Sequence, residues 1–146
     1  MLNYQRTDPV VLIGSKSGTT RTSVALTTGY DVANKTKIFE TEGYSELVLD
    51  VLYTTGSGET SNSVEIRVED SVDGTNFYRL SNESASAGTS TITQREFTFV
   101  GASAATAYAF SYRLDISYQS MRISVKESGV VTNAGTIFVE GQLSGN

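Results

Sequence analysis

Apolar and polar residues alternate with a period of two along most of this chain. The longest run covers residues 108–118, where every second position carries a large apolar side chain: Tyr108, Phe110, Tyr112, Leu114, Ile116 and Tyr118. Residues 64–69 and 121–126 alternate in the same way. Successive side chains of a β-strand point to opposite faces, so each run predicts a strand with one buried face. Shorter apolar runs predict further strands at residues 10–13, 20–28, 37–40, 91–100 and 136–143.

The segment 46–54 differs from the other runs because it is apolar on both faces. One face carries Leu47, Leu49, Val51 and Tyr53, and the other carries Val48 and Leu52 on either side of Asp50. A strand of this kind is expected at the centre of a sheet, or beneath another surface that covers its second face.

A β-hairpin is predicted over residues 63–80. The alternating residues 64–69 are followed by Asp73-Gly74, and glycine accepts the positive φ that a tight turn requires. Phe77, Tyr78 and Leu80 then lead the chain back. The charged residues between the apolar ones are expected on the solvated face.

About eight or nine strands separated by turns, with helix in at most one short segment, indicate an all-β protein. We expect a single antiparallel β-sandwich of jelly-roll-like arrangement over residues 19–146. Residues 1–18 are expected to form an N-terminal arm or an edge strand. The predicted core comprises Val24, Leu26, Leu49, Val51, Ile66, Val68, Phe110, Tyr112, Leu114, Ile116, Ile123, Val125 and Val139.

Composition narrows the function classes. The 146 residues include no His and no Cys, which removes the commonest general base and the usual zinc ligands, so no enzymatic activity and no cofactor are expected. The net charge of −5 is spread along the chain, and a nucleic-acid partner is not expected without clustered Lys or Arg. The apolar run 10–13 is too short for a signal peptide core or a membrane span. We therefore expect synthesis in a cytoplasm and no membrane partner.

Two groups of acidic and amide side chains are candidates for chemistry. Glu65 and Glu69 lie on one strand face with Arg67 between them, which is typical of a solvated face and not of a glycosidase pair. Oxygens of Asp70, Asp73 and Asn76 could form a loose calcium site, but hairpin turn chemistry explains the same residues. An EF-hand is excluded, because its terminal ligand position falls on Leu80.

The stretch Ser71-Val72-Asp73-Gly74-Thr75-Asn76-Phe77-Tyr78-Arg79-Leu80 resembles a hairpin that recurs in β-sandwich proteins of tailed-phage virions. The later order of an aromatic strand, the strand 121–125 and a closing strand near Gly141 is also similar. The resemblance implies a capsid decoration (cement) protein or an accessory head or tail protein that stabilises neighbouring virion subunits. It implies major capsid or tail subunits as partners, a location in the virion after synthesis in the host cytoplasm, and a homo-oligomer such as a trimer.

The same order also resembles discoidin-like jelly-roll modules that bind carbohydrate. Those modules usually have Trp where this chain has Phe77, and their paired cysteines are missing here. A sugar-binding function would need an exposed aromatic platform, and the available rings are those of Tyr30, Tyr44, Phe77 and Tyr78.

Two apolar surfaces are the candidates for a partner interface. The first is the N-terminal arm, and the second is the outer face of the strand 46–54; together they comprise Leu2, Tyr4, Val10, Val11, Leu12, Ile13, Val48 and Leu52. The alternative for residues 10–13 is that they add an edge strand to their own sheet.

Overall fold

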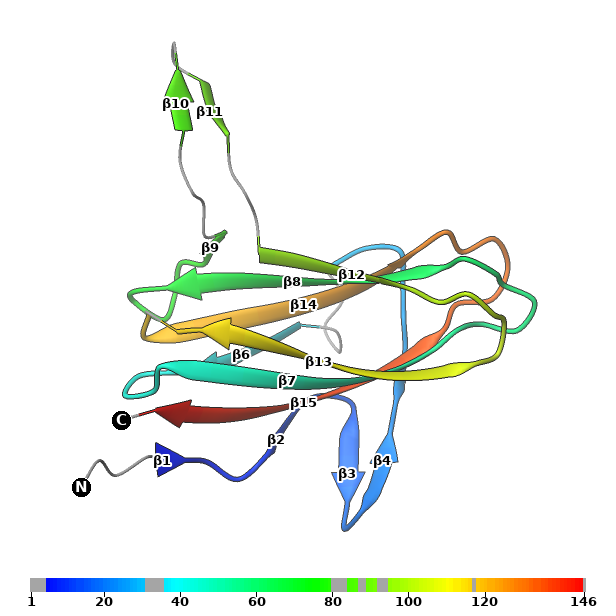
Figure 1. Cartoon of the computed structure of the whole chain (residues 1–146), viewed down its shortest axis with the longest axis horizontal. Helices are drawn as coiled ribbons and strands as arrows, with labels where there is room; N and C mark the ends of the chain where they lie inside the picture. Colours follow the sequence, from blue (N-terminus) through cyan, green and yellow to red (C-terminus); the bar gives the residue numbers. More distant parts are fainter. Residues whose placement is uncertain are drawn as a thin grey trace.

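The computed structural model describes residues 5–30, 36–79, 84–86, 89–91, 95–116 and 118–145. These residues form no helix, and two antiparallel sheets pack face to face, as Figure 1 shows. The predicted all-β sandwich in a single domain is therefore confirmed.

The first sheet is built around β15 (Thr136–Gly145) and β7 (Glu46–Thr54), with β13 (Ala107–Asp115) on the far side of β7. The other edge of β15 is covered by three short strands that pair with successive parts of it: β1 (Gln5–Arg6), β2 (Val10–Ile13) and β5 (Val24–Ala25). The second sheet has the order β12 (Arg95–Val100), β8 (Ser63–Ser71), β14 (Ser120–Ser128) and β6 (Thr36–Glu40), and β9 (Tyr78–Arg79) also pairs with β8.

The order of the strands is that of a jelly roll. When β2, β6, β7, β8, β12, β13, β14 and β15 are numbered in chain order, the first sheet reads 1-8-3-6 and the second reads 2-7-4-5. The first strand pairs with the last, the second with the seventh, the third with the sixth and the fourth with the fifth. This is a long antiparallel ladder rolled into two layers.

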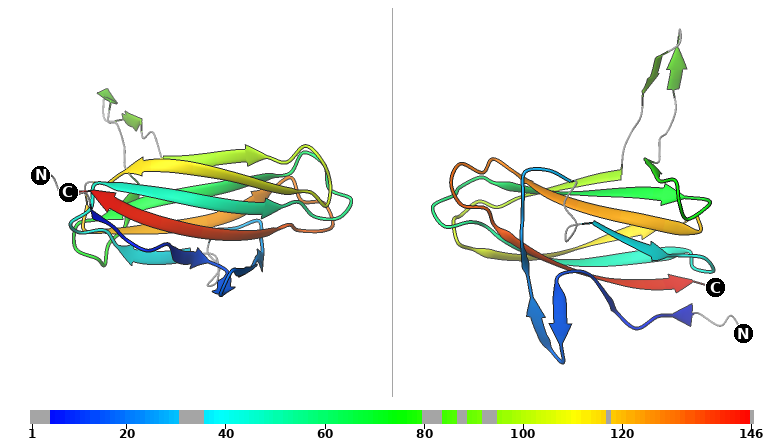
Figure 2. Two further views of the ribbon diagram at one scale, coloured as in Figure 1. Left: turned by 60° about the horizontal axis from the view of Figure 1, so that its bottom comes forward. Right: turned by 180° about the vertical axis from the view of Figure 1, so that it is seen from behind.

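Two small hairpins project from the sandwich. β3 (Ser15–Ser17) pairs with β4 (Thr20–Thr22), and β10 (Ser84–Ser86) pairs with β11 (Thr89–Thr91). Both stand away from the two main layers in Figure 1 and in the rear view of Figure 2.

The core lies between the two sheets. Ten of the predicted core residues are buried: Leu26, Leu49, Val51, Ile66, Val68, Leu114, Ile116, Ile123, Val125 and Val139. Val24, Phe110 and Tyr112 are only partly buried, although they pack against the core. The two aromatic residues are less covered than predicted because β13 lies at an edge of its sheet, whereas β7 is central, as its two apolar faces predicted.

Tyr53 and Glu127 form a polar tie between the sheets. The Tyr53 hydroxyl of β7 donates to Glu127 Oε1 of β14 at 2.6 Å, and the Gly135 N–H donates to Glu127 Oε2 at 2.7 Å. Both side chains are fully buried. Burial, together with the hydrogen bond to the Glu127 carboxylate, raises the pKa of Tyr53. A buried polar group of this kind is stable only because it has partners.

The predicted hairpin is confirmed. β8 and β9 are antiparallel, with Glu69 opposite Arg79 and Asp70 opposite Tyr78, and Gly74 has a φ of +72°. The Asp73 carboxylate accepts N–H groups of Thr75 and Asn76 at 2.8 Å each, and these bonds hold its pKa well below the usual range. The turn itself therefore uses the Asp73 oxygens that a calcium site would need.

Candidate functional site

The most accessible binding feature of the fold is the free edge of β13. No strand in the described part of the chain pairs with this edge. The Ile116 N–H donates to Ser45 O, and the Thr55 N–H donates to Thr106 O, so even-numbered residues of β13 point their backbone groups at β7. Because these groups alternate along a strand, the odd residues 107–115 direct theirs at the free edge.

The first six residues of β13 lack the protection that sheet edges usually carry, and the charged residues Arg113 and Asp115 come only at its end. Residues 107–112 are uncharged, there is no proline, and the register with β7 runs without a bulge. The outward residues Ala107, Ala109 and Ser111 are small and exposed. The edge strand β6 has Lys37 and Glu40 in five residues, and β12 begins with charged residues. Charges, prolines and bulges are the common means of blocking strand addition, so β13 is open to a partner strand.

A row of stacked aromatic rings lies directly behind this edge, between β13 and β12. Phe97 stacks on Tyr112 with ring centroids 4.4 Å apart, and Phe99 stacks on Phe110 at 4.3 Å. Tyr108 contacts Phe99 at 5.3 Å. All five rings are partly buried, so this side of the sandwich has incompletely covered apolar surface. In the left view of Figure 2, β12 and β13 run together along one margin of the molecule.

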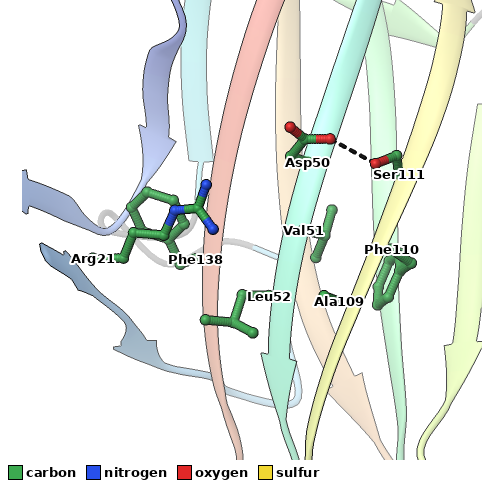
Figure 3. A pocket seen from close by; sticks show the side chains of 8 residues that line it. All are labelled: Arg21, Asp50, Val51, Leu52, Ala109, Phe110, Ser111 and Phe138. Atoms are coloured by element: carbon green, nitrogen blue, oxygen red, sulfur yellow. Dashed lines mark hydrogen bonds between the residues drawn. The ribbon is translucent and has the colours of Figure 1, made fainter. Parts of the chain in front are cut away.

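A groove of about 220 Å³ lies on the outer face of the first sheet (Figure 3). Leu52, Ala109 and Phe138 line its apolar part. Asp50 accepts a hydrogen bond from Ser111 Oγ at 2.6 Å on its polar side. The Arg21 guanidinium lies 5.4 Å from the Phe138 ring centroid and covers it. The groove extends from β15 across β7 to β13, next to the free edge.

The β3–β4 hairpin is fixed to this face through one carboxylate. Glu140 of β15, which is buried, lies 2.6 Å from Lys16 Nζ and 3.1 Å from Arg21 Nη2. The hydrogen bond and charge of Lys16, with those of Arg21, hold the pKa of Glu140 below its usual value. Charge pairing to β15 is therefore what positions Arg21 at the groove.

The outer face of the second sheet carries charges that are matched within the chain. Arg67 pairs with Glu96 at 2.9 Å, Arg122 with Glu69 at 2.8 Å, and Lys126 with Glu65 at 3.1 Å. Each pair joins residues directly opposite on neighbouring strands. The predicted carboxylates Glu65 and Glu69 are thus ion-pair partners on a strand face. In these three pairs each positive charge is matched by a carboxylate of the neighbouring strand.

The loops at one end of the sandwich are joined by Glu59. Its carboxylate accepts backbone N–H groups of Asn133, Thr132 and Val131, and these bonds lower its pKa. Since Glu59 is almost fully buried, its role is to connect the loop after β7 to the loop before β15.

The predicted interface residues differ in how far their side chains are buried. Leu12 and Ile13 are buried in their own core through the pairing of β2 with β15, so they are not available to a partner and this prediction is corrected. Val10 is half exposed beside them, and Val11 is partly buried. Residues 10–13 thus form the edge strand that was the stated alternative. Val48 and Leu52 lie on the outer face of β7, partly buried, and Leu2 and Tyr4 lie outside the described residues.

The aromatic residues considered for sugar binding do not form a common exposed platform. Tyr30 is buried, with the Arg67 guanidinium 4.0 Å from its ring centroid. Tyr44 packs against the core, and Phe77 is partly buried with Arg122 4.9 Å from its ring. Only Tyr78 among these four is largely exposed. A flat aromatic surface for a sugar ring is therefore not assembled from these residues.

In the described part of the chain, no three His, Cys, Asp or Glu side chains come together in a way that could hold a metal ion. Nor do these residues contain a helix long and apolar enough to cross a membrane. Neither the models of known protein families nor the curated proteins give a match to this chain.

The free edge of β13 was not identified from the sequence. The alternation of residues 108–118 predicted a strand, and its aromatic face was assigned to the core. The available signal was on the other face, where Ala107, Ala109 and Ser111 are too small to cover a neighbouring surface. Which strand lies at an edge depends on the order of strands in the sheet, and alternation does not encode that order.

Proposed function

We propose that this protein is a non-enzymatic structural protein of a tailed-phage virion, a capsid decoration or accessory head or tail protein that binds neighbouring subunits and stabilises them. The observation that carries the proposal is the free edge of β13. A nine-residue strand without charge, proline or bulge along its first six residues offers backbone groups for strand addition. A protein that functions alone would need such an edge to be blocked.

Two further features support an assembly role over a chemical one. The partly buried aromatic rings behind β13 supply apolar area for an interface, and aromatic residues are frequent interface anchors. The outer groove, with Leu52 on its floor, widens the surface next to the edge. The charged groups of the other sheet are matched internally and offer no catalytic pair. The virion as the setting rests on the resemblance of the Ser71–Leu80 hairpin.

The jelly roll itself does not decide between candidate functions, because viral capsid proteins and lectin domains share it. The carbohydrate-binding alternative depended on an exposed aromatic platform, and the rings of Tyr30 and Tyr44 are covered by their own chain. No observation therefore favours a sugar ligand over a protein partner.

Particles that assemble without this protein provide the test. Recombinant protein is added to them, the particles are pelleted through a density cushion, and the bound protein is measured. We expect wild-type protein to pellet with the particles and the variant Ala109→Lys, which places a charge on the free edge, to lose most of this binding. The matched control Ser17→Lys makes the same charge change on the β3–β4 hairpin and should bind normally. Equal pelleting of Ala109→Lys would contradict the edge as the site, and absence of wild-type protein from particles would contradict the virion function.

A further inference from the structure

The occupant of the β13 edge can be inferred from the edge itself. We propose that a second copy of this chain pairs with it, so that two β13 strands run antiparallel and join the two first sheets into one continuous sheet. This inference rests on the proposed role of the edge as an interface and identifies the partner at that edge. A self-paired edge is closed to capsid or tail subunits, so Ala109→Lys would weaken particle binding by separating the two copies that bind together. The structure supports self-pairing through the side chains that such a pairing would bring together.

The register that gives full overlap places Ser111 on a two-fold axis. Ala109, Ser111 and Arg113 then face Arg113, Ser111 and Ala109 of the other copy, and the N–H and C=O groups of these three central pairs supply about six interstrand hydrogen bonds. No residue of β13 within the described chain already uses this edge for strand pairing. Registers displaced by two or four residues leave part of the strand unpaired.

Side chains on both faces are compatible with this register. On the outer face, Arg113 lies opposite Ala109 of the other copy, and Asp115 lies opposite Ala107, so no like charges meet and each long side chain faces a small one. On the inner face, Phe110 lies opposite Tyr112 of the other copy, and this pair occurs twice. Cross-strand aromatic pairs stabilise antiparallel sheets, so the two aromatic rows would form one continuous surface. The strand carries one positive and one negative charge, so the two paired strands bring no net charge together.

Edge pairing of this kind is isologous: each copy contributes the same surface, and the assembly closes at two chains. It therefore predicts a dimer where the sequence resemblance suggested a trimer. A different protein strand donated to the same edge is the competing occupant, and it would leave the isolated chain monomeric.

The absence of cysteine in this chain allows a direct test by disulfide cross-linking. Opposed residues in a hydrogen-bonded antiparallel pair have Cα atoms about 5.5 Å apart, within the range of a disulfide. The variant Ser111→Cys should thus form a covalent dimer under mild oxidation. The variant Ala109→Cys should not, because its counterpart in the other copy lies about 13 Å away along the strand. Mixing Ala109→Cys with Arg113→Cys should restore the cross-link.

Solution mass gives the second measurement. Light scattering after size exclusion should give twice the chain mass of 15.7 kDa for the wild type and for Ser17→Lys. The variant Ala109→Lys should return to the mass of a single chain with an unchanged circular dichroism spectrum. Three times the chain mass, or cross-linking of Ala109→Cys as efficient as that of Ser111→Cys, would overturn the pairing. A monomeric wild type that still pellets with particles through this edge would refute self-pairing and leave the proposed function standing. A dimer that never binds particles would support self-pairing and refute the proposed function.

Discussion

Removing the acceptors of the buried inter-sheet tie should destabilise the sandwich more than most single substitutions. Replacing Glu127 with Met keeps much of the side-chain volume but leaves the Tyr53 hydroxyl and the Gly135 N–H without a partner. It also removes the longer hydrogen bond, 3.5 Å, that the Asn62 amide donates to Glu127. Each donor buried without an acceptor costs about 1–3 kcal/mol, so the two together cost about 2–6 kcal/mol. This is a large part of the about 5–15 kcal/mol by which small domains are stable.

A double-mutant cycle separates this effect from a simple packing defect. Tyr53→Phe alone removes a hydrogen bond to a carboxylate and should cost about 1.5–3 kcal/mol. In the Glu127→Met background the hydroxyl has already lost its acceptor, so Tyr53→Phe should be close to neutral or slightly stabilising. The expected coupling energy between the two positions is thus about 1.5–3 kcal/mol.

Urea unfolding followed by circular dichroism measures these values. Circular dichroism is preferable to fluorescence for this chain. The chain contains no Trp, and the substitution Tyr53→Phe would itself change the tyrosine fluorescence. The slope with urea should stay the same in all four proteins, as expected where substitutions change stability and not the surface exposed on unfolding. Additive effects of the two substitutions within about 0.3 kcal/mol would show that the tie does not couple the sheets.

Four further outcomes follow from the structure. Leu114→Ala should cost about 2–5 kcal/mol in the same urea assay, and a loss below about 1 kcal/mol would mean that this side chain is not in the core. Glu140→Gln should free the β3–β4 hairpin, so that trypsin cleaves after Lys16 or Arg21 at least about 2- to 30-fold faster, because even solvent-exposed ion pairs contribute about 0.2–1 kcal/mol each and Glu140 is buried; an unchanged rate would show that the ion pairs do not hold the hairpin. Glu59 and Glu140 have folded-state pKa values below the ordinary value of 4.5, so their contribution to stability is present above this pH and is lost as the pH falls below it. The free energy of unfolding, measured as a function of acid pH, should show this decline. The variant Glu140→Gln should make the decline smaller. The melting temperature should not change in EDTA, and a drop of several degrees would point to a bound metal ion.

Local patterns in the sequence were sufficient to predict the class of the fold. Alternation with a period of two reflects only the geometry of one strand against one apolar layer, so it could be recognised at residues 64–69 and 121–126 without their partners. The two apolar faces of the segment 46–54 also predicted its central place in a sheet. The turn at Asp73-Gly74 was predictable because its backbone bonds lie within a few residues.

The tertiary structure decided which surfaces are buried and which remain open. Leu12 and Ile13 are core residues only because β2 pairs with β15, more than a hundred positions later in the chain. Phe110 and Tyr112 have the same alternation as central strands, yet they lie at an edge because no strand of the described residues pairs with the far side of β13. Strand order results from pairings between distant segments, whereas alternation records only that one face of a strand meets an apolar layer. The core could therefore be predicted largely from the sequence, and the open edge of β13 only from the assembled sandwich.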